Sequence, residues 1–316
     1  MTRVGRVGVV VAQRRRAPSH DQGGGLIVSA YAKINLCLDV LGKRPDGMHE
    51  IATVMQTISL ADRLQFLSHE ELSLRCRGMS ARPDNLILRA AQLLRERVGD
   101  GHGAKILCEK RIPLGAGLGG GSSDAAATLI GLNQLWNAGL DIDALTELAC
   151  QLGSDVPFFL HGGTALATGT GTMVECLEDA PACWVVLALA AGETSEKTAS
   201  MYGALAASDF VDGSRCQAQV ASLRQGCLAA LAVSSSLWGP ATRRWGHLSD
   251  LQRRLMTAGA IAATVAGSGP SSFGLFPTRS AAIRGLRAAR EVLTTARMYR
   301  FVGRSASRGP HERDLI

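Results

Sequence analysis

The sequence predicts an α+β protein built from two domains. Its 316 residues are enough for two domains of ordinary size. With 46% apolar and 19% charged residues the chain can bury a sizeable core, which excludes a disordered or fibrous protein. Strand-like and helix-like segments alternate without a regular βαβ repeat, which favours α+β over a doubly wound sheet. We expect domains at 26–180 and 181–302, between a basic, disordered extension at 1–25 and a flexible tail at 303–316.

Hydrophobic periodicity predicts the elements of the first domain. Apolar and polar side chains alternate over residues 32–40, which indicates a strand whose polar face carries Lys33 and Asn35. A similar alternation at 50–60 follows a turn-like Arg-Pro-Asp-Gly. The further expected elements are a helix from Leu86, a strand at 104–112, helices at 123–136 and 142–152, and a strand-like region from Val156.

The second domain is expected to begin with a buried strand at 184–189, where six apolar residues follow one another. No apolar run reaches the roughly 18–20 residues needed to span a bilayer. After this strand we expect helices near 197–207, 216–232 and 248–258, a strand–glycine turn–strand at 260–276, and a last helix at 279–293.

Charge and cysteine usage limit the functional classes. The net charge is +7, but five arginines and one aspartate lie in the extension, with no aromatic residues between them, so nucleic-acid binding is not expected. The eight cysteines contain no C-x-x-C pair, which excludes the usual zinc spacings and offers no disulfide framework. No secretory signal is visible. We therefore expect buried thiols and a cytoplasmic location.

The most informative segment is a glycine-rich stretch at 113–124. Five glycines within 115–121 allow the backbone to approach a ligand closely and to turn its amides inward. The exposed amides and the positive dipole end of the following helix suit a polyphosphate. The residues expected to bind ATP phosphates here are Pro113, Leu114, Gly115, Ala116, Gly117, Leu118, Gly119, Gly120, Gly121, Ser122 and Ser123.

Other interpretations of this stretch remain open. The Walker A pattern is absent, so an ordinary P-loop NTPase is not expected. Three of its glycines satisfy G-x-G-x-x-G, and Asp141 lies downstream at a distance suited to a ribose contact, so an NAD(P)-binding oxidoreductase is an alternative. That pattern arises easily in any loop so rich in glycine. A plain turn with a serine helix cap is a third interpretation.

Taken together, five stretches in order resemble the GHMP small-molecule kinases, whose central motif reads Pro-x-Gly-x-Gly-Leu-Gly-x-Ser-Ser. The resemblance covers roughly residues 27–300. It implies an N-terminal, ribosomal-protein-S5-like domain that binds ATP and carries catalysis, and a C-terminal, ferredoxin-like α/β sandwich that completes the substrate site. The five stretches are 32–36, 44–50, 113–126, 152–159 and 266–271.

The resemblance implies that ATP, with Mg²⁺, phosphorylates the tertiary 2-hydroxyl of a cytidine-diphosphate-linked methylerythritol, in non-mevalonate isoprenoid biosynthesis. The family's catalytic pair falls on Lys33 and Asp155. A tertiary alcohol is a poor nucleophile, so Asp155 would accept its proton while Lys33 stabilises the developing charge. Homoserine or mevalonate are alternative acceptors, and a nucleotide-binding protein without catalysis is a further alternative. We expect a monomer or homodimer with no nucleic-acid or membrane partner.

The resemblance also places substrate contacts. Asn35 shares a strand face with Lys33 and would orient it or the substrate. His49 matches the family residue that hydrogen-bonds cytosine, and Tyr202 is expected to stack on that base. Met48 stands where the family commonly has a tyrosine. Asn85 matches a helix start near the adenine.

Some positions depart from the family pattern or lack a clear role. Residues 234–240 stand where members of the family usually carry an Asn-Asp-Leu-Glu-like stretch. No dedicated acidic Mg²⁺ ligand is evident in the sequence. Ser123 and Asp155 are the expected metal ligands, because Mg²⁺ prefers oxygen. Gly267 and Gly269 are expected to allow a tight turn beside the phosphate loop.

Overall fold

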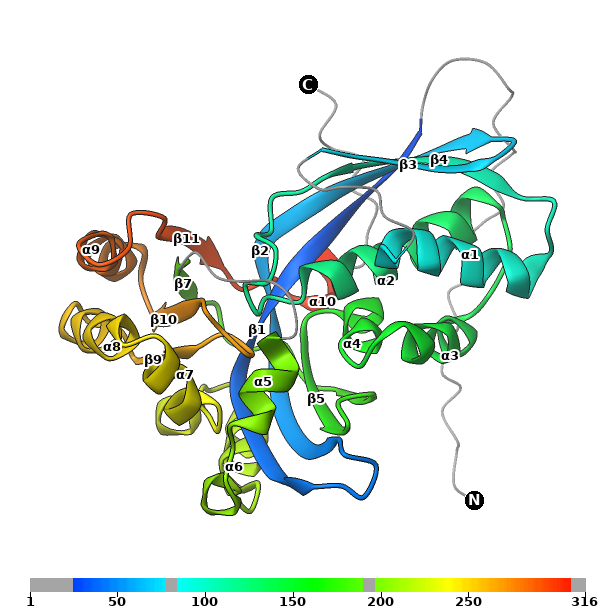
Figure 1. Cartoon of the computed structure of the whole chain (residues 1–316). Coiled ribbons are helices and arrows are strands. Elements are labelled where there is room, and N and C mark those ends of the chain that lie inside the picture. Colours follow the sequence, from blue (N-terminus) through cyan, green and yellow to red (C-terminus); the bar gives the residue numbers. More distant parts are fainter. Residues whose placement is uncertain (1–24, 78–83, 190–196, 308–316) are drawn as a thin grey trace, which may run out of the picture.

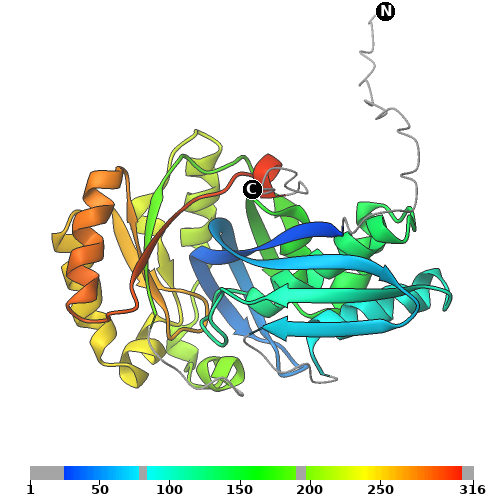
Figure 2. The ribbon, with the colours of Figure 1, turned by 90° about the horizontal axis from the view of Figure 1, so that it is seen from above.

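The computed structural model describes residues 25–77, 84–189 and 197–307. The expected extension, apart from Gly25, and residues 308–316 of the expected tail lie outside these ranges. The described chain forms two β-sheets with helices packed against each (Figures 1 and 2). This confirms the predicted α+β class. Within these ranges, no helix combines the length and apolar character that crossing a membrane requires.

The larger sheet is built around two long antiparallel strands, β1 and β2, and has the order β3-β4-β2-β1-β8. In addition, β5 pairs with the first part of β2, and β6 pairs with β5. Its register shifts twice near the middle of β1, between Tyr31 and Ala32 and between Asn35 and Cys37. Such irregularities bend a strand and re-aim its side chains. The strands are β1 (Leu26–Lys43), β2 (His49–His69), β3 (Leu72–Arg77), β4 (Gly103–Glu109), β5 (Thr164–Gly169), β6 (Met173–Cys176) and β8 (Ser234–Ser235).

Four helices pack on one face of this sheet (Figure 1). Phe66 and Ile106 of the sheet are fully buried with Leu94 and Leu129 of the helices. Gly131 is needed on the central helix, because a Cβ there would meet the ring of Phe66 at 2.4–2.8 Å. The helices are α1 (Leu86–Val98), α2 (Gly120–Leu135), α3 (Ile142–Leu152) and α4 (Val156–His161).

The smaller sheet has the order β11-β7-β10-β9 and is covered on its outer face by α8 and α9, where Phe276 and Leu255 are buried. On its inner face Val185 and Phe273 share one apolar cluster with Ile34 of β1, so the two sheets have a common core. Its elements are β7 (Trp184–Ala188), β9 (Ala262–Val265), β10 (Ser272–Phe276), β11 (Arg297–Arg300), α8 (His247–Thr257) and α9 (Arg279–Arg290).

The remaining elements connect the two sheets or lie beside them. The helix expected at 216–232 ends at Leu223, because Gly226 takes a positive φ and donates its N–H to the Leu223 carbonyl. The strand-like region from Val156 was predicted wrongly: it forms α4, with Pro157 in the first turn, where proline is tolerated. The elements not yet given are α5 (Lys197–Gly203), α6 (Ser214–Leu223), α7 (Trp238–Arg244), α10 (Arg304–Ser307) and the 3₁₀ turns Ala207–Asp209 and Ala230–Ala232.

The first residues of the predicted flexible tail are held in place. Arg304 donates to the carbonyls of Thr164 and Leu177 at 2.8 and 2.9 Å, and its backbone N–H donates to Asp179. Residues 304–307 form α10. The prediction of a flexible tail is therefore wrong for 303–307, since several hydrogen bonds fix this segment to the larger sheet.

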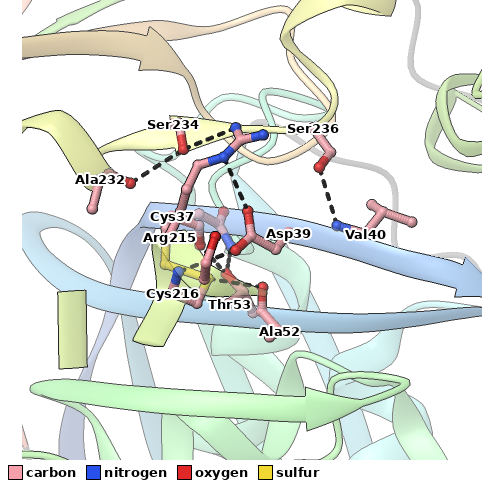
Figure 3. The surroundings of a disulfide bond; sticks show 12 residues. Cys37, Asp39, Val40, Ala52, Thr53, Arg215, Cys216, Ala232, Ser234 and Ser236 are labelled. Carbon is pink, nitrogen blue, oxygen red and sulfur yellow. Dashed lines mark hydrogen bonds and ion pairs between the residues drawn. A yellow bond between two sulfur atoms is a disulfide. The ribbon is translucent and has the colours of Figure 1, made fainter. Parts of the chain in front are cut away.

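The expectation about cysteines also needs correction. Cys37 of β1 and Cys216 of α6 form a disulfide, with their Cα atoms 5.7 Å apart (Figure 3). Three further cysteines are exposed rather than buried: Cys150, Cys176 and Cys227. The pairing was not predictable, because 179 residues separate the two partners and only the fold brings them together.

The departure at 234–240 has a structural account at its start. β8 adds a short parallel strand beside β1, and the Ser236 hydroxyl accepts the N–H of Val40 at 3.1 Å. Ser234 accepts a hydrogen bond from Arg215, which also approaches the buried carboxylate of Asp39 (Figure 3). The strand pairing and Ser236 therefore join this segment to β1, and Ser234 joins it to α6.

Candidate active site

Lys33 and Asp155 meet beside the glycine-rich loop, although 122 residues separate them in the sequence. The Lys33 Nζ lies 3.4 Å from the Asp155 Oδ2. The lysine side chain is only 5% exposed, whereas that of Asp155 is 37% exposed. Asp155 directly precedes α4, and Lys33 lies in the middle of β1. The pair thus places a buried ammonium beside a carboxylate that a substrate can still reach.

A chain of hydrogen bonds sets the direction of the Lys33 side chain. The Lys33 Nζ donates to the Asn35 Oδ1 at 2.9 Å, and the Asn35 Nδ2 donates to the Thr53 Oγ1 at 2.8 Å. The Thr53 hydroxyl donates to the Cys37 carbonyl at 2.7 Å. All four residues are buried. Asn35 therefore orients Lys33 in this structure, and Thr53, which the sequence did not single out, orients Asn35.

The glycine-rich loop packs directly on Lys33. The Lys33 N–H donates to the Leu118 carbonyl at 3.0 Å, and a Cβ at Gly119 would lie 3.2 Å from the Lys33 Cγ. Gly119, at φ +71°, precedes α2, which begins at Gly120, three residues earlier than predicted. The loop thus brings the N-terminal turn of α2, with its free amides, to the Lys33–Asp155 pair.

The members of the loop divide into anchors and exposed positions. Ala116 and Leu118 are buried in the core shared by the two sheets, and Ser123 donates its hydroxyl to the Tyr31 carbonyl at 2.6 Å. These contacts attach the loop to the core and to β1. The residues left exposed or half-buried, and so open to a ligand, are Pro113, Leu114, Gly115, Gly117, Gly119, Gly120, Gly121 and Ser122.

A second glycine turn supports the loop from the smaller sheet, as expected from the sequence. A Cβ at Gly267 would lie 2.6 Å from the Gly117 carbonyl oxygen, and a Cβ at Gly117 would clash with the Ala266 carbonyl. Both glycines have positive φ, as does Gly269. The two backbones can approach this closely only because side chains are missing.

Replacing Gly117 by alanine should therefore weaken ATP binding. Its φ of +80° strains any other residue by about 1–3 kcal/mol, and the added methyl group would push the loop off residues 266–267. We expect a lower melting temperature and a smaller rise of that temperature on adding ATP. Gly42→Ala is the matched control, because no atom lies within 4 Å of its Cβ position. Equal ATP stabilisation of both variants would contradict the prediction.

Asn85 lies at the start of α1, next to the loop. Its Oδ1 accepts the N–H of Ile87 at 2.9 Å, so it is a helix cap. Its Nδ2 is buried and has no hydrogen-bond partner among the described residues. A Cβ at Gly121 would lie 3.5 Å from Leu86, the next residue. An unpaired donor beside the loop is suited to a nucleobase, because buried polar groups are rarely left unsatisfied.

A group of aromatic side chains lies around His49. The His49 ring lies 5.2 Å from that of Tyr202 and 6.1 Å from that of Phe210, which the sequence analysis missed. Burial and the Asp155 charge raise the pKa of Tyr202, which places its phenol near the carboxylate. Burial and Lys43 lower the pKa of His49, so its imidazole is neutral at pH 7. Met48 beside it is 51% exposed.

The residues expected to hold Mg²⁺ differ in how well they fit that role. Asp155 presents a partly exposed carboxylate, a ligand that Mg²⁺ accepts. Ser123 is 2% exposed, and its hydroxyl is engaged with Tyr31. No cluster of three or more His, Cys, Asp or Glu suited to a metal is found in the described part of the chain. The donor set therefore fits a cation held chiefly by substrate phosphates and water, with Asp155 as the protein ligand.

Asp141, the residue expected to contact a ribose in a dinucleotide-binding protein, is a helix cap. It is exposed and accepts the N–H of Ala144 at 2.9 Å, at the start of α3. The whole length of α2 lies between it and the loop. This position does not fit the dinucleotide interpretation.

Comparison with known proteins places the chain among small-molecule kinases. The family described as GHMP kinases N terminal domain matches residues 85–163, and GHMP kinases C terminal matches 246–295. A 4-diphosphocytidyl-2-C-methyl-D-erythritol kinase of Pelotomaculum thermopropionicum is 44% identical in an alignment of 276 residues that covers 84% of this chain and 96% of that protein. A protein of the same name from Bacillus cytotoxicus is 42% identical over 256 residues, covering 79% and 88%.

Solved structures agree with this similarity. A crystal structure of 4-(cytidine 5'-diphospho)-2C-methyl-D-erythritol kinase has a TM-score of 0.76 and 36% identity, covering 88% of this chain and 100% of that one. A homoserine kinase from Cytophaga hutchinsonii has a TM-score of 0.71 at 17% identity, covering 92% and 99%. At that identity the second similarity shows the fold alone.

Proposed function

Since this chain belongs to the GHMP kinase family, we propose that it transfers the terminal phosphoryl group of ATP to the 2-hydroxyl of 4-diphosphocytidyl-2-C-methyl-D-erythritol. Membership confirms the predicted GHMP-kinase-like architecture and a small-molecule kinase, and it does not support the oxidoreductase alternative. The proposal rests above all on the contact of Lys33 with Asp155 beside the phosphate loop. The names of relatives at 42–44% identity supply the acceptor. The reaction belongs to non-mevalonate isoprenoid biosynthesis.

In the proposed mechanism Asp155 is the general base. The acceptor oxygen attacks the terminal phosphorus of ATP, its proton passes to the Asp155 carboxylate, and the bond to the leaving oxygen of ADP breaks. Lys33, held by Asn35, stabilises negative charge on the transferring oxygens. The loop amides at 115–123 bind the phosphates, and Asn85 contacts the adenine.

Magnesium fits this site through Asp155 and the ATP phosphates. When bound, it neutralises phosphate charge during transfer. Asp155 would be the protein residue that holds it, because its side chain is the exposed member of the pair. Ser123 as a second ligand remains a prediction.

The aromatic group around His49 is proposed to bind the cytidine end of the acceptor. A neutral imidazole can both donate and accept hydrogen bonds to a base edge. Tyr202 and Phe210 offer ring faces for stacking, and Met48 offers a polarizable thioether. The position of Tyr202 near Asp155 would keep the base and the reacting hydroxyl on the same side of the site.

An acceptor panel tests the proposal. Release of ADP is measured with the cytidylyl-methylerythritol, homoserine, mevalonate and galactose, and ³¹P NMR locates the new phosphate ester. We expect kcat/KM for the cytidylyl acceptor to exceed the others by at least about 100-fold, because a site that hydrogen-bonds its substrate rejects analogues lacking the partner group. Faster reaction with homoserine or mevalonate would be consistent with the kinase family but would contradict the proposed acceptor.

Three accompanying expectations remain predictions. The chain is expected to act in the cytoplasm as a monomer or homodimer. Neither nucleic acid nor a membrane is expected as a partner. The domain boundaries at 180 and 302 are likewise proposed, with the phosphate loop in the first domain and Tyr202 in the second.

A further inference from the structure

A buried cluster of three charged side chains lies beneath the phosphate loop. The Lys110 ammonium contacts the Asp62 carboxylate and lies 2.6 Å from the Asp124 Oδ2. The three side chains are 5%, 0% and 2% exposed, respectively. They come from the segment after β4, from β2 and from the position just after the first turn of α2. None of them belongs to the proposed catalytic pair or to the expected ligand contacts.

The cluster holds both ends of the loop. The Asp62 Oδ1 accepts the N–H groups of Arg111 and Ile112, the latter at 2.8 Å, directly before Pro113. Asp124 lies at the other end, after Ser123. Between them, a Cβ at Gly120 would lie 3.5 Å from the Lys110 Nζ. The Lys110 ammonium therefore connects β2, which fixes the start of the loop through Asp62, to α2, which follows the loop.

Stability alone does not account for such a cluster. Removing charges from water is costly, and apolar replacements of buried ion pairs are often neutral or stabilising. Removing one partner, in contrast, leaves an uncompensated charge and disturbs its surroundings strongly. What the three residues provide is a defined position of the loop relative to α2, and a binding site for phosphates depends on the direction of its amides.

We propose that Lys110 is a positioning residue, which aligns the loop amides and the first turn of α2 for the ATP phosphates by bridging Asp62 and Asp124. This proposal rests on the proposed use of ATP. It assigns to Lys110 no contact with ATP itself. Its effect should therefore appear in ATP binding and leave binding of the acceptor unchanged.

Asp124 keeps one carboxylate oxygen, Oδ1, without a hydrogen-bond partner within the described ranges. Besides Lys110 and Asp62, the groups facing Asp124 are the thiols of Cys76 and Cys108. Lys110 is thus the cation paired with both buried carboxylates.

Lys110→Met is the decisive variant. We expect the Kd for ATP, measured by isothermal titration calorimetry, to rise by about tenfold or more, while the KM for the acceptor stays within about twofold. Without the ammonium, the two carboxylates lose the cation that they share, and the loop and α2 lose the group that joins them. Arg111→Met is the matched control, because the side chain of Arg111 is exposed and pairs only with exposed Glu109 among the described residues.

A volume-conserving change separates positioning from simple loss of structure. In Lys110→Met/Asp124→Asn the new amide can donate to Asp62, so most of the lost ATP affinity should return. Asp124→Asn alone should keep the ATP Kd within about threefold, because the amide oxygen can still accept from Lys110. If Lys110→Met does not fold, the ATP Kd values of these two variants test the role of Lys110.

Several outcomes would overturn the role of Lys110. They are an ATP Kd of Lys110→Met within about twofold of the parent, an equal loss of ATP and acceptor binding, or a loss of ATP affinity that adding Asp124→Asn to Lys110→Met does not reduce. A parent protein that binds ATP but phosphorylates none of the four acceptors would refute the proposed function instead. The ATP titrations would then still report on Lys110.

Discussion

Replacing Asp155 by asparagine is expected to lower kcat by at least about 100-fold, the lower range of a general-base contribution. Asparagine keeps the size of the side chain but cannot accept the proton of the acceptor hydroxyl. The ATP Kd should change little, because the phosphates are bound mainly by the loop at 115–123. Steady-state ADP release gives kcat, and calorimetric titration gives the ATP affinity.

A matched substitution guards against a general effect of losing a carboxylate. Asp141→Asn changes an exposed helix cap, and asparagine caps helices as well as aspartate does. Its kcat should equal that of the parent protein. If Asp155→Asn turned over as fast as Asp141→Asn, Asp155 would have no part in proton transfer.

Lys33→Met is expected to have the second largest effect, with kcat lowered by about 100-fold or more and the ATP Kd raised much less. Methionine preserves the apolar stem that packs near Gly119 but removes the ammonium. Asp155 then loses the cation at 3.4 Å, and the transferring oxygens lose their stabilising charge. Single-turnover measurements at saturating ATP separate this chemical defect from ATP binding.

The suitable control for Lys33 is Lys105→Met, a change of the same type on an exposed position of β4. It should leave both kcat and ATP affinity unchanged. Equal losses of kcat and ATP affinity in Lys33→Met would make Lys33 a phosphate anchor and not a stabiliser of the transition state. The proposed active site would stand, but Lys33 would no longer be assigned to the stabilisation of the transition state.

The local parts of the site were predictable because their signals are local. Glycine density marked the phosphate loop, and a capping asparagine marked α1; α1 and α3 both begin where expected. The prediction failed where two structures share one pattern: the apolar segment from Val156 suits a strand or a short helix equally well. The limits of the tail likewise depended on hydrogen bonds of Arg304 that no local pattern contains.

The contacts between distant residues were predictable only where a resemblance supplied them. Lys33 and Asp155 were paired by family motifs and not by spacing. No sequence pattern indicated a role for Phe210, Thr53 or the cluster of Lys110. Their roles follow from contacts with residues that are distant in the sequence. The disulfide of Cys37 was missed for the same reason.

By itself, the order of residues in this chain determined the α+β class, the glycine-rich loop with its helix, and membership in a family of kinases. The class and the loop depend on backbone preferences and periodicity over a few residues, whereas the family followed from the resemblance of five motifs. Only the tertiary structure decided which side chains meet across β1, α2 and α4, and which charges are buried there. The physical reason is that burial and Coulomb interaction depend on distance in space, which separation along the chain does not encode.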